Sequence, residues 1–236
     1  MPEDKNHNIG LFFDLDDTLY NEAEFRKEGF WSVAKFVEAS FNIPATRFMA
    51  NLQKIIEKNS LYKENIFDDV LERLDASSTI HVEELVEVYR KHSSSIKLYD
   101  DATNLLERLS GHFILGLITD GHIDVQKSKV EALKLPKYFN NNIIYTHSLG
   151  PNCSKPSPLP FKKLLKRTEI RSENSYYVGN DPYKDFIGAK QVGMMTIRLL
   201  KGRYADVTEK PQYRIDYNVN KLTDIMKIIK NNNIEL

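Results

Sequence analysis

Two aspartates, Asp14 and Asp16, follow directly on a short apolar run near the start of the chain. The run, residues 11–13, has the composition of a short buried strand. Two carboxylates at this spacing repel one another, and a bound cation is the usual way to offset that repulsion. Because magnesium takes oxygen ligands from a few carboxylates, the pair indicates a magnesium site where the strand meets its loop.

Further polar residues follow two later apolar runs, residues 113–118 and 175–178. The carboxyl ends of parallel strands share one edge of a sheet, so these residues are expected to meet the aspartate pair there. Acid, hydroxyl, base and cation together suit phosphoryl transfer. The set comprises Thr119, Asp120 and Gly121 after the first run, Asn180, Asp181 and Asp185 after the second, and Lys155 in a loop before a predicted helix.

The second half of the chain, which would position these residues, alternates between strand and helix patterns. This alternation predicts an α/β fold, a Rossmann-like three-layer α/β/α core around a parallel sheet. A polar loop with Gly202 and Pro211, and polar tails at residues 1–8 and 231–233, complete the pattern. The expected strands span 9–15, 113–118, 142–147, 175–178 and 194–200, and the expected helices 100–109, 123–135, 160–167, 184–192 and 221–230.

The stretch between residues 22 and 95 has helical periodicity throughout. Four amphipathic stripes with short links predict a small helical bundle, inserted just after the first strand. The domain prediction is therefore a Rossmann-like catalytic core of residues 1–20 and 96–236, and an α-helical domain of residues 21–95.

Composition narrows the class of protein. The 33 basic and 33 acidic residues balance, which gives no reason to expect binding to nucleic acid or to a membrane surface. The single cysteine, Cys153, excludes a disulfide within the chain and fits a reducing compartment. The polar stretch 1–8 has no apolar signal core, so a cytoplasmic protein is expected, either a monomer or a homodimer.

Four motifs in order resemble those of the haloacid dehalogenase superfamily, in the branch with an α-helical cap inserted after the first motif. They are DLDDTLY at 14–20, LITDG at 117–121, SKPSP at 154–158 and GNDPYKD at 179–185. Each motif alone is modest evidence. Together, at the expected sheet edge and across essentially the whole chain, they form a specific signal.

The resemblance implies that Asp14 is a nucleophile that forms an aspartyl-phosphate. It implies that Asp16 protonates the leaving oxygen and then activates water, so surroundings that favour its protonated form are expected. Thr119 and Lys155 would hold the phosphoryl oxygens, with Asp120 and Gly121 beside them in the substrate-binding loop. Mg²⁺ would bridge Asp14, the main-chain carbonyl of Asp16, a phosphoryl oxygen and the fourth motif.

Two departures from the family pattern leave alternatives open. The fourth motif often has Asp directly after Gly, whereas here Asn180 precedes Asp181. Either residue could face the metal, and Asp181 is the favoured ligand, with Asp185 orienting Lys155. The second motif commonly has Asn where this chain has Asp120, which is expected to offer mainly its backbone, or to contact a hydroxyl or amine of the substrate.

The resulting prediction is a magnesium-dependent phosphatase acting on a small soluble phosphomonoester such as a sugar phosphate or a nucleotide. The second aspartate of the pair, Asp16, argues for phosphate rather than for dehalogenation. A phosphomutase of the same superfamily shares the first chemical step and stays an alternative. A binding or regulatory protein that keeps the fold without turnover is the third hypothesis.

Overall fold

The computed structural model describes residues 9–208 and 215–232. The tail expected at 1–8, Pro211 of the expected loop and residue 233 of the expected tail lie outside these ranges. The chain divides into two compact units, one of Met1–Asn21 with Lys97–Leu236 and one of Glu22–Ile96. Within the described ranges, no helix combines the length and apolar character needed to cross a membrane.

The first unit is built on a six-stranded sheet with strand order β3-β2-β1-β4-β5-β6, all of whose pairings are parallel. Strand β1 (Gly10–Phe13) is fully buried between β2 (Ile114–Thr119) and β4 (Ser175–Gly179). The outer strands are β3 (Ile143–Tyr145), β5 (Met195–Leu199) and β6 (Tyr217–Val219). Strand β6 lies in the region expected to be a loop. It was not predicted, because three residues are too few to show an alternating pattern.

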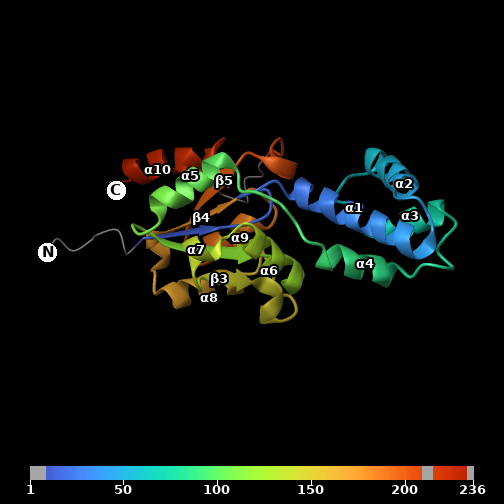
Figure 1. The fold of residues 1–236 in the computed structure, drawn as a ribbon. Helices are drawn as coiled ribbons and strands as arrows, with labels where there is room; N and C mark the ends of the chain where they lie inside the picture. The colour runs from blue at the N-terminus through green and yellow to red at the C-terminus, as the bar shows by residue number, and fades with distance from the viewer. Residues whose placement is uncertain (1–8, 209–214, 233–236) are drawn as a thin grey trace. The chain divides into compact units, whose positions relative to one another are not determined.

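Helices cover both faces of this sheet (Figure 1). On one face, Phe12 of β1 packs in a core with side chains from two helices, α8 and α9. On the other face its neighbour Phe13 contacts Phe139 of α7, with ring centroids 6.1 Å apart. The helices are α5 (Asp100–Leu109), α6 (Ile123–Ala132), α7 (Pro136–Phe139), α8 (Leu159–Thr168), α9 (Asp185–Gln191) and α10 (Ile225–Asn231).

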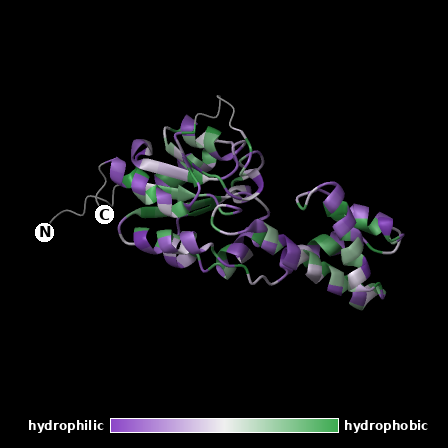
Figure 2. Ribbon diagram, turned by 90° about the horizontal axis from the view of Figure 1, so that it is seen from above, coloured by the Kyte–Doolittle hydropathy of each residue, from purple (hydrophilic) through white to green (hydrophobic). Residues whose placement is uncertain are grey.

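The second unit consists of α1 (Glu22–Phe41), α2 (Ala45–Lys58), α3 (Ile66–Arg73) and α4 (Val82–Lys91). Its own core includes Phe30, Phe67 and Tyr89, whose rings meet at centroid distances of 5.6–5.9 Å. Figure 2 shows hydrophobic and hydrophilic residues alternating along the helices, as amphipathic packing requires. The predicted fold class, a parallel α/β core with an all-helical insertion after the first strand, is confirmed.

Candidate active site

The carboxyl ends of three neighbouring strands bring the predicted residues to one edge of the sheet. Asp14 continues β1, and its N–H donates to the carbonyl of Val178 in β4 at 2.8 Å. In the pairing register, Phe13 lies opposite Leu117 of β2 and Val178 of β4. Thr119 and Asn180 lie two residues beyond those partners, so the ends of all three strands stand side by side.

Lys155 joins the carboxylates of Asp14 and Asp185 in the interior of this edge. Its ammonium lies 2.5 Å from Oδ1 of Asp14 and 2.7 Å from Oδ1 of Asp185, and it donates to the Tyr177 hydroxyl at 3.0 Å. The Lys155 side chain is fully buried. Although burial alone would lower the pKa of Lys155, the two carboxylates raise it well above its usual value. The lysine is therefore a permanent cation.

Asp14 is the least stably charged member of this group. Burial raises the pKa of its carboxyl to about 7, because loss of water outweighs the attraction of Lys155, and the negative charge of Asp185 adds to the shift. The Asp14 carboxyl, 3% exposed, therefore lies in a site that is short of positive charge. A divalent cation at this carboxylate would supply that charge, so the electrostatics fit a metal.

The donor set predicted for such a cation is composed of oxygens. Asp14 and the main-chain carbonyl of Asp16 come from one loop, and Asn180 or Asp181 from another. Across residues 9–208 and 215–232, no three His, Cys, Asp or Glu side chains cluster in a way that could hold a metal. The predicted set does not need such a cluster, since it uses a carbonyl and a substrate oxygen. Magnesium commonly keeps few protein ligands when it binds a phosphate.

The contacts of the fourth motif distinguish Asn180 from Asp181. The Thr18 hydroxyl lies 3.3 Å from Oδ2 of Asp14 and 3.5 Å from Oδ1 of Asn180, so both oxygens converge on one group. Asp181 instead accepts the N–H of Tyr183 at 2.9 Å and a bond from the Tyr204 hydroxyl. The sequence favoured Asp181 as the metal ligand, and in this structure it is the Asn180 amide oxygen that lies near the Thr18 hydroxyl together with Asp14.

Asp185 is the residue that ties the fourth motif to the lysine. Its Oδ2 accepts the N–H groups of Asn180 at 3.1 Å and Asp181 at 2.9 Å, while Oδ1 accepts from Lys155. A Cβ on Gly179 would lie 2.5 Å from that same Oδ2, so only glycine leaves room for this carboxylate. Asp185 thus contacts Lys155 as the sequence analysis expected.

The surroundings of Asp16 differ from the expectation. Oδ1 of Asp16 accepts from Lys129 of α6 at 2.7 Å and from the Tyr20 hydroxyl at 2.5 Å. Although burial would raise the pKa of Asp16, the charge and hydrogen bond of Lys129, together with the bond from Tyr20, lower it below its usual value. The expectation of surroundings that favour the protonated carboxyl is therefore wrong, because a buried ammonium stabilises the ionised form.

Thr119 and Asp120 make contacts that the sequence did not indicate. The Thr119 hydroxyl donates to Oε1 of Gln126 at 2.9 Å. Oδ1 of Asp120 accepts from the Thr146 hydroxyl at 2.8 Å and from the N–H of Lys155 at 3.2 Å. Asp120 therefore fixes the loop that carries Lys155. Gly121 follows with a φ of +123°, a conformation that disfavours other residues.

Asp17 supports the turn after β1. It has a φ of 56°, is buried, and accepts the N–H of Arg203 at 3.3 Å through Oδ2. A Cβ on Gly202 would lie 2.5 Å from the Cβ of Asp17, so the loop after β5 packs closely on this turn. The turn that presents Asp14 and Asp16 is thus held from the side of the sheet where β5 ends.

Among the polar residues of this region that sequence analysis missed are Gln126, Lys129 and Lys184. Gln126 and Lys129 are buried on the inner face of α6, and polar residues at positions of a helix that should be apolar were the available signal. Lys184 lies 3.7 Å from Oδ2 of Asp120. Burial and the charge of Lys155 oppose its ionisation, but three nearby carboxylates, Asp14 foremost, raise its pKa.

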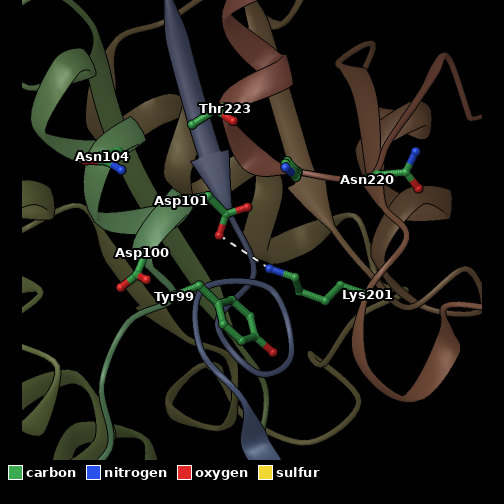
Figure 3. Close-up of a pocket in the computed structure, with 8 residues that line it drawn as sticks. Tyr99, Asp100, Asp101, Asn104, Lys201, Asn220 and Thr223 are labelled. Carbon is green, nitrogen blue, oxygen red and sulfur yellow. Dashed lines mark hydrogen bonds and ion pairs between the residues drawn. The ribbon is translucent and has the colours of Figure 1, made fainter.

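A cavity of about 560 Å³ lined by polar residue types lies in the same unit but contains none of the predicted site residues. Figure 3 shows its Lys201 and Asp101 side chains pointing toward one another, and they lie 3.3 Å apart. Oδ2 of Asp101 also accepts the N–H of Leu222 at 2.9 Å, so this carboxylate ties together parts of the fold. The lining residues are Tyr99, Asp100, Asp101, Asn104, Lys201, Asn220, Lys221 and Thr223.

The chain is similar in sequence to known enzymes. The sequence model described as haloacid dehalogenase-like hydrolase matches residues 11–199. A glyceraldehyde 3-phosphate phosphatase of Methanocaldococcus jannaschii is 34% identical over 230 residues, which cover 94% of this chain and 97% of that protein. A phosphoserine phosphatase of Thermus thermophilus is 26% identical, with 84% of this chain and 78% of that protein covered.

Solved structures agree on the fold. The hydrolase YfnB of Bacillus subtilis, solved with magnesium bound, superposes with a TM-score of 0.66 at 20% identity, covering 94% of this chain and 99% of that one. A 2-haloacid dehalogenase of Pseudomonas syringae superposes with a TM-score of 0.63 at 23% identity, covering 94% and 98%. At these identities the structural likeness shows a shared architecture, and the chemistry must be argued from the residues.

Proposed function

The chain belongs to the haloacid dehalogenase-like hydrolase family, and we propose that it is a magnesium-dependent phosphatase of a small phosphomonoester. The observation that carries the proposal is the buried contact of Asp14 with Lys155, at 2.5 Å, on the strand end that also presents Asp16. A nucleophilic carboxylate, a fixed cation and a second carboxylate two residues on are the groups that a two-step phosphoryl transfer uses.

In the first step, a carboxylate oxygen of Asp14 forms a bond to phosphorus as the bond to the ester oxygen breaks. The leaving oxygen takes the electron pair of that bond and a proton from Asp16, which reacts here from its minor protonated form because Lys129 stabilises the ionised form. Lys155 offsets the negative charge of the phosphoryl oxygens, and its contact with Asp185 keeps its ammonium in place. The products are the free alcohol and an aspartyl-phosphate at Asp14.

In the second step, a water molecule attacks the phosphorus and gives a proton to the carboxylate of Asp16. The bond between phosphorus and Asp14 breaks, which returns Asp14 as a carboxylate and releases inorganic phosphate. The lowered pKa of Asp16 suits this half of the cycle, because the group must be ionised to accept the proton.

Magnesium would be held by Asp14, by the main-chain carbonyl of Asp16 and by the amide oxygen of Asn180, with Asp181 as the alternative ligand. When bound, the ion would polarise the phosphoryl group and offset its charge. Support comes from the raised pKa of Asp14, which indicates a shortage of positive charge at that carboxylate. The oxygen-only donor set is the kind that magnesium prefers.

The relatives supply the first candidate substrates. Glyceraldehyde 3-phosphate phosphatases of Methanocaldococcus jannaschii and Pyrococcus furiosus are 34% and 28% identical to this chain. We therefore place glyceraldehyde 3-phosphate first among the substrates to test, followed by other short phosphorylated metabolites. We also propose that residues 1–20 and 96–236 form the catalytic core and that residues 21–95 form the cap that selects the substrate.

A phosphate-release screen over several dozen phosphorylated metabolites, with magnesium, tests the proposal. The wild-type protein should release phosphate from one or a few short esters, and Asp14→Asn should abolish this activity. Robust turnover by Asp14→Asn would show that Asp14 is not the nucleophile. A protein that moves phosphate between hydroxyls and needs a bisphosphate activator would be a mutase, and ligand binding without turnover would indicate a regulatory role.

A further inference from the structure

Helix α6 carries two buried polar side chains, Gln126 and Lys129, that reach the strand end of Asp16. They lie three positions apart, so they share one face of the helix. Gln126 is 4% exposed and Lys129 3% exposed. Lysine is seldom buried to this extent without a charged partner, and the partner here is the Asp16 carboxylate.

The two oxygens of the Asp16 carboxylate are held unequally. Oδ1 accepts two strong bonds, from the Lys129 ammonium at 2.7 Å and the Tyr20 hydroxyl at 2.5 Å. Oδ2 accepts from Nε2 of Gln126 at 3.3 Å, which is long for a hydrogen bond. The carboxylate is therefore fixed in orientation through Oδ1, and Oδ2 is the oxygen with the weaker contact.

Gln126 connects this carboxylate to the second motif. Its Oε1 accepts the Thr119 hydroxyl at 2.9 Å while its Nε2 faces Asp16, so the Thr119 contact sets which end of the amide points at the carboxylate. The chain of contacts runs from the residue expected to hold phosphate to the residue expected to move the proton. Helix α6 thereby positions two functional groups at once.

A purely structural role explains Lys129 poorly. Replacing a buried ion pair by well-packed apolar side chains is often neutral or stabilising, so fold stability alone gives little reason for a lysine at this position. The lysine is directed at a carboxylate that lies two residues from Asp14. Its ammonium also lies 6.0 Å from the centre of the Tyr20 ring, the second donor to Oδ1.

We propose that Lys129 is a positioning residue that, with Tyr20, fixes Oδ1 of Asp16, so that Oδ2 exchanges the proton with the leaving oxygen and then with water. The inference rests on the proposed phosphatase function and deepens it. Without the ammonium, the carboxylate would rotate among several orientations. Both chemical steps would slow, while the affinity for the phosphate group, held by Thr119 and Lys155, would change little.

Rapid-quench and steady-state kinetics on the full-length protein test this with two substrates. p-Nitrophenyl phosphate has a leaving group that departs without a proton, whereas glycerol 3-phosphate has an alkoxide that needs one. In Lys129→Met, turnover of both should fall roughly 10- to 100-fold, the size of effect usual for residues that orient catalytic groups. The KM of glycerol 3-phosphate should change by less than about 3-fold, because both of its steps slow, whereas the KM of the nitrophenyl substrate should fall together with its turnover. The nitrophenyl substrate alone should then show a burst of product followed by slow turnover.

Controls separate positioning from structure. Lys127 is an exposed lysine of the same helix, and Lys127→Met should behave as wild type. Lys129→Arg should recover part of the lost turnover, because it keeps a cation near Oδ1. If Lys129→Met fails to fold, the comparison of Asp16→Asn with Asp16→Asn/Lys129→Met tests the proposal instead. The double variant removes the buried ammonium and its carboxylate partner together, so no unpaired charge is left.

The outcomes are distinct. Equal burst and turnover in those two Asp16→Asn variants would support the proposal, because Lys129 then acts only through Asp16. Further slowing in the double variant, or wild-type kinetics in a folded Lys129→Met, would overturn it. A wild-type protein without any phosphatase activity would refute the proposed function instead, and the inference with it.

Discussion

Asp185→Asn is the substitution whose effect the structure specifies in most detail. The fully buried Asp185 carboxylate accepts three N–H groups, one from Lys155 on Oδ1 and two main-chain N–H groups on Oδ2. Asparagine has a single acceptor oxygen. Whichever way its amide turns, an NH₂ group faces either the Lys155 ammonium or the main-chain N–H groups of Asn180 and Asp181.

The magnitude follows from these bonds. A hydrogen bond to a charged group contributes ~1.5–3 kcal/mol, and leaving a buried donor unsatisfied costs a similar amount. Lys155 keeps Asp14 as a partner, so the loss is below the full cost of a broken buried pair. The free energy of unfolding should fall by about 3 kcal/mol. Because Lys155 also loses its anchor, kcat/KM should fall by roughly 10²-fold, which equals about 2.7 kcal/mol.

Urea unfolding followed by circular dichroism and phosphate-release kinetics would measure the two losses. Asp124→Asn is a suitable control, since the Asp124 side chain is 77% exposed on α6 and its replacement should change neither quantity. An Asp185→Asn protein with wild-type unfolding and wild-type kcat/KM would refute the argument that this carboxylate holds Lys155 and the fourth motif in place.

Three further predictions follow from other parts of the site and the sheet. Gly179→Ala should lower kcat/KM by roughly 10²-fold, because the new Cβ would lie 2.5 Å from Oδ2 of Asp185 and must displace it. Normal kinetics in this variant would show that the carboxylate has room to move. Burial raises the pKa of the Asp216 carboxyl, but its contacts with Lys190 and with the N–H and hydroxyl of Thr196 lower it below its usual value. These contacts should add about 1 kcal/mol to the free energy of unfolding after allowance for solvent, present above about pH 4 and lost as the pH falls through the lowered pKa. In urea unfolding, Asp216→Asn should therefore be less stable than wild type at pH 7, and the two should converge in acid. Chelation with EDTA should reduce phosphate release to background. Added Mg²⁺ should restore the activity and raise the melting temperature of the protein. Full activity in EDTA would exclude a metal-dependent reaction.

The alternation of strand and helix patterns predicted the fold class, and the four motifs predicted the family and the place of the site. Asp14 follows a strand that is fully buried in the centre of the sheet, and the polar residues after β2 and β4 do lie beside it, because parallel strands put their carboxyl ends on one edge. The family membership predicted from the motifs and the fold class predicted from the alternating strands and helices are both confirmed. Strand β6 was missed because Tyr217–Val219 is short and has only one buried residue.

The contacts around Asp16 could not be predicted from the motifs. Lys129 comes 113 positions after Asp16 in sequence, and the helix that carries it was recognised only by its apolar residues. Burial would raise the pKa of Asp16, but that ammonium lowers it most, with Tyr20 and Lys184 adding to the effect, so the expectation about its protonation was wrong. Likewise, the Asn180 side chain lies near the Thr18 hydroxyl, a contact that the motif alone does not reveal.

The central claim is that Asp14 is the nucleophile, and trapping the covalent intermediate tests it most directly. The purified protein would be mixed with magnesium and the best substrate of the screen, quenched in acid within milliseconds, digested and analysed by mass spectrometry. Phosphate should be found on Asp14, with a rate of formation at least as fast as turnover, and Asp14→Asn should carry none. Turnover without phosphate on Asp14 at any quench time would contradict the account.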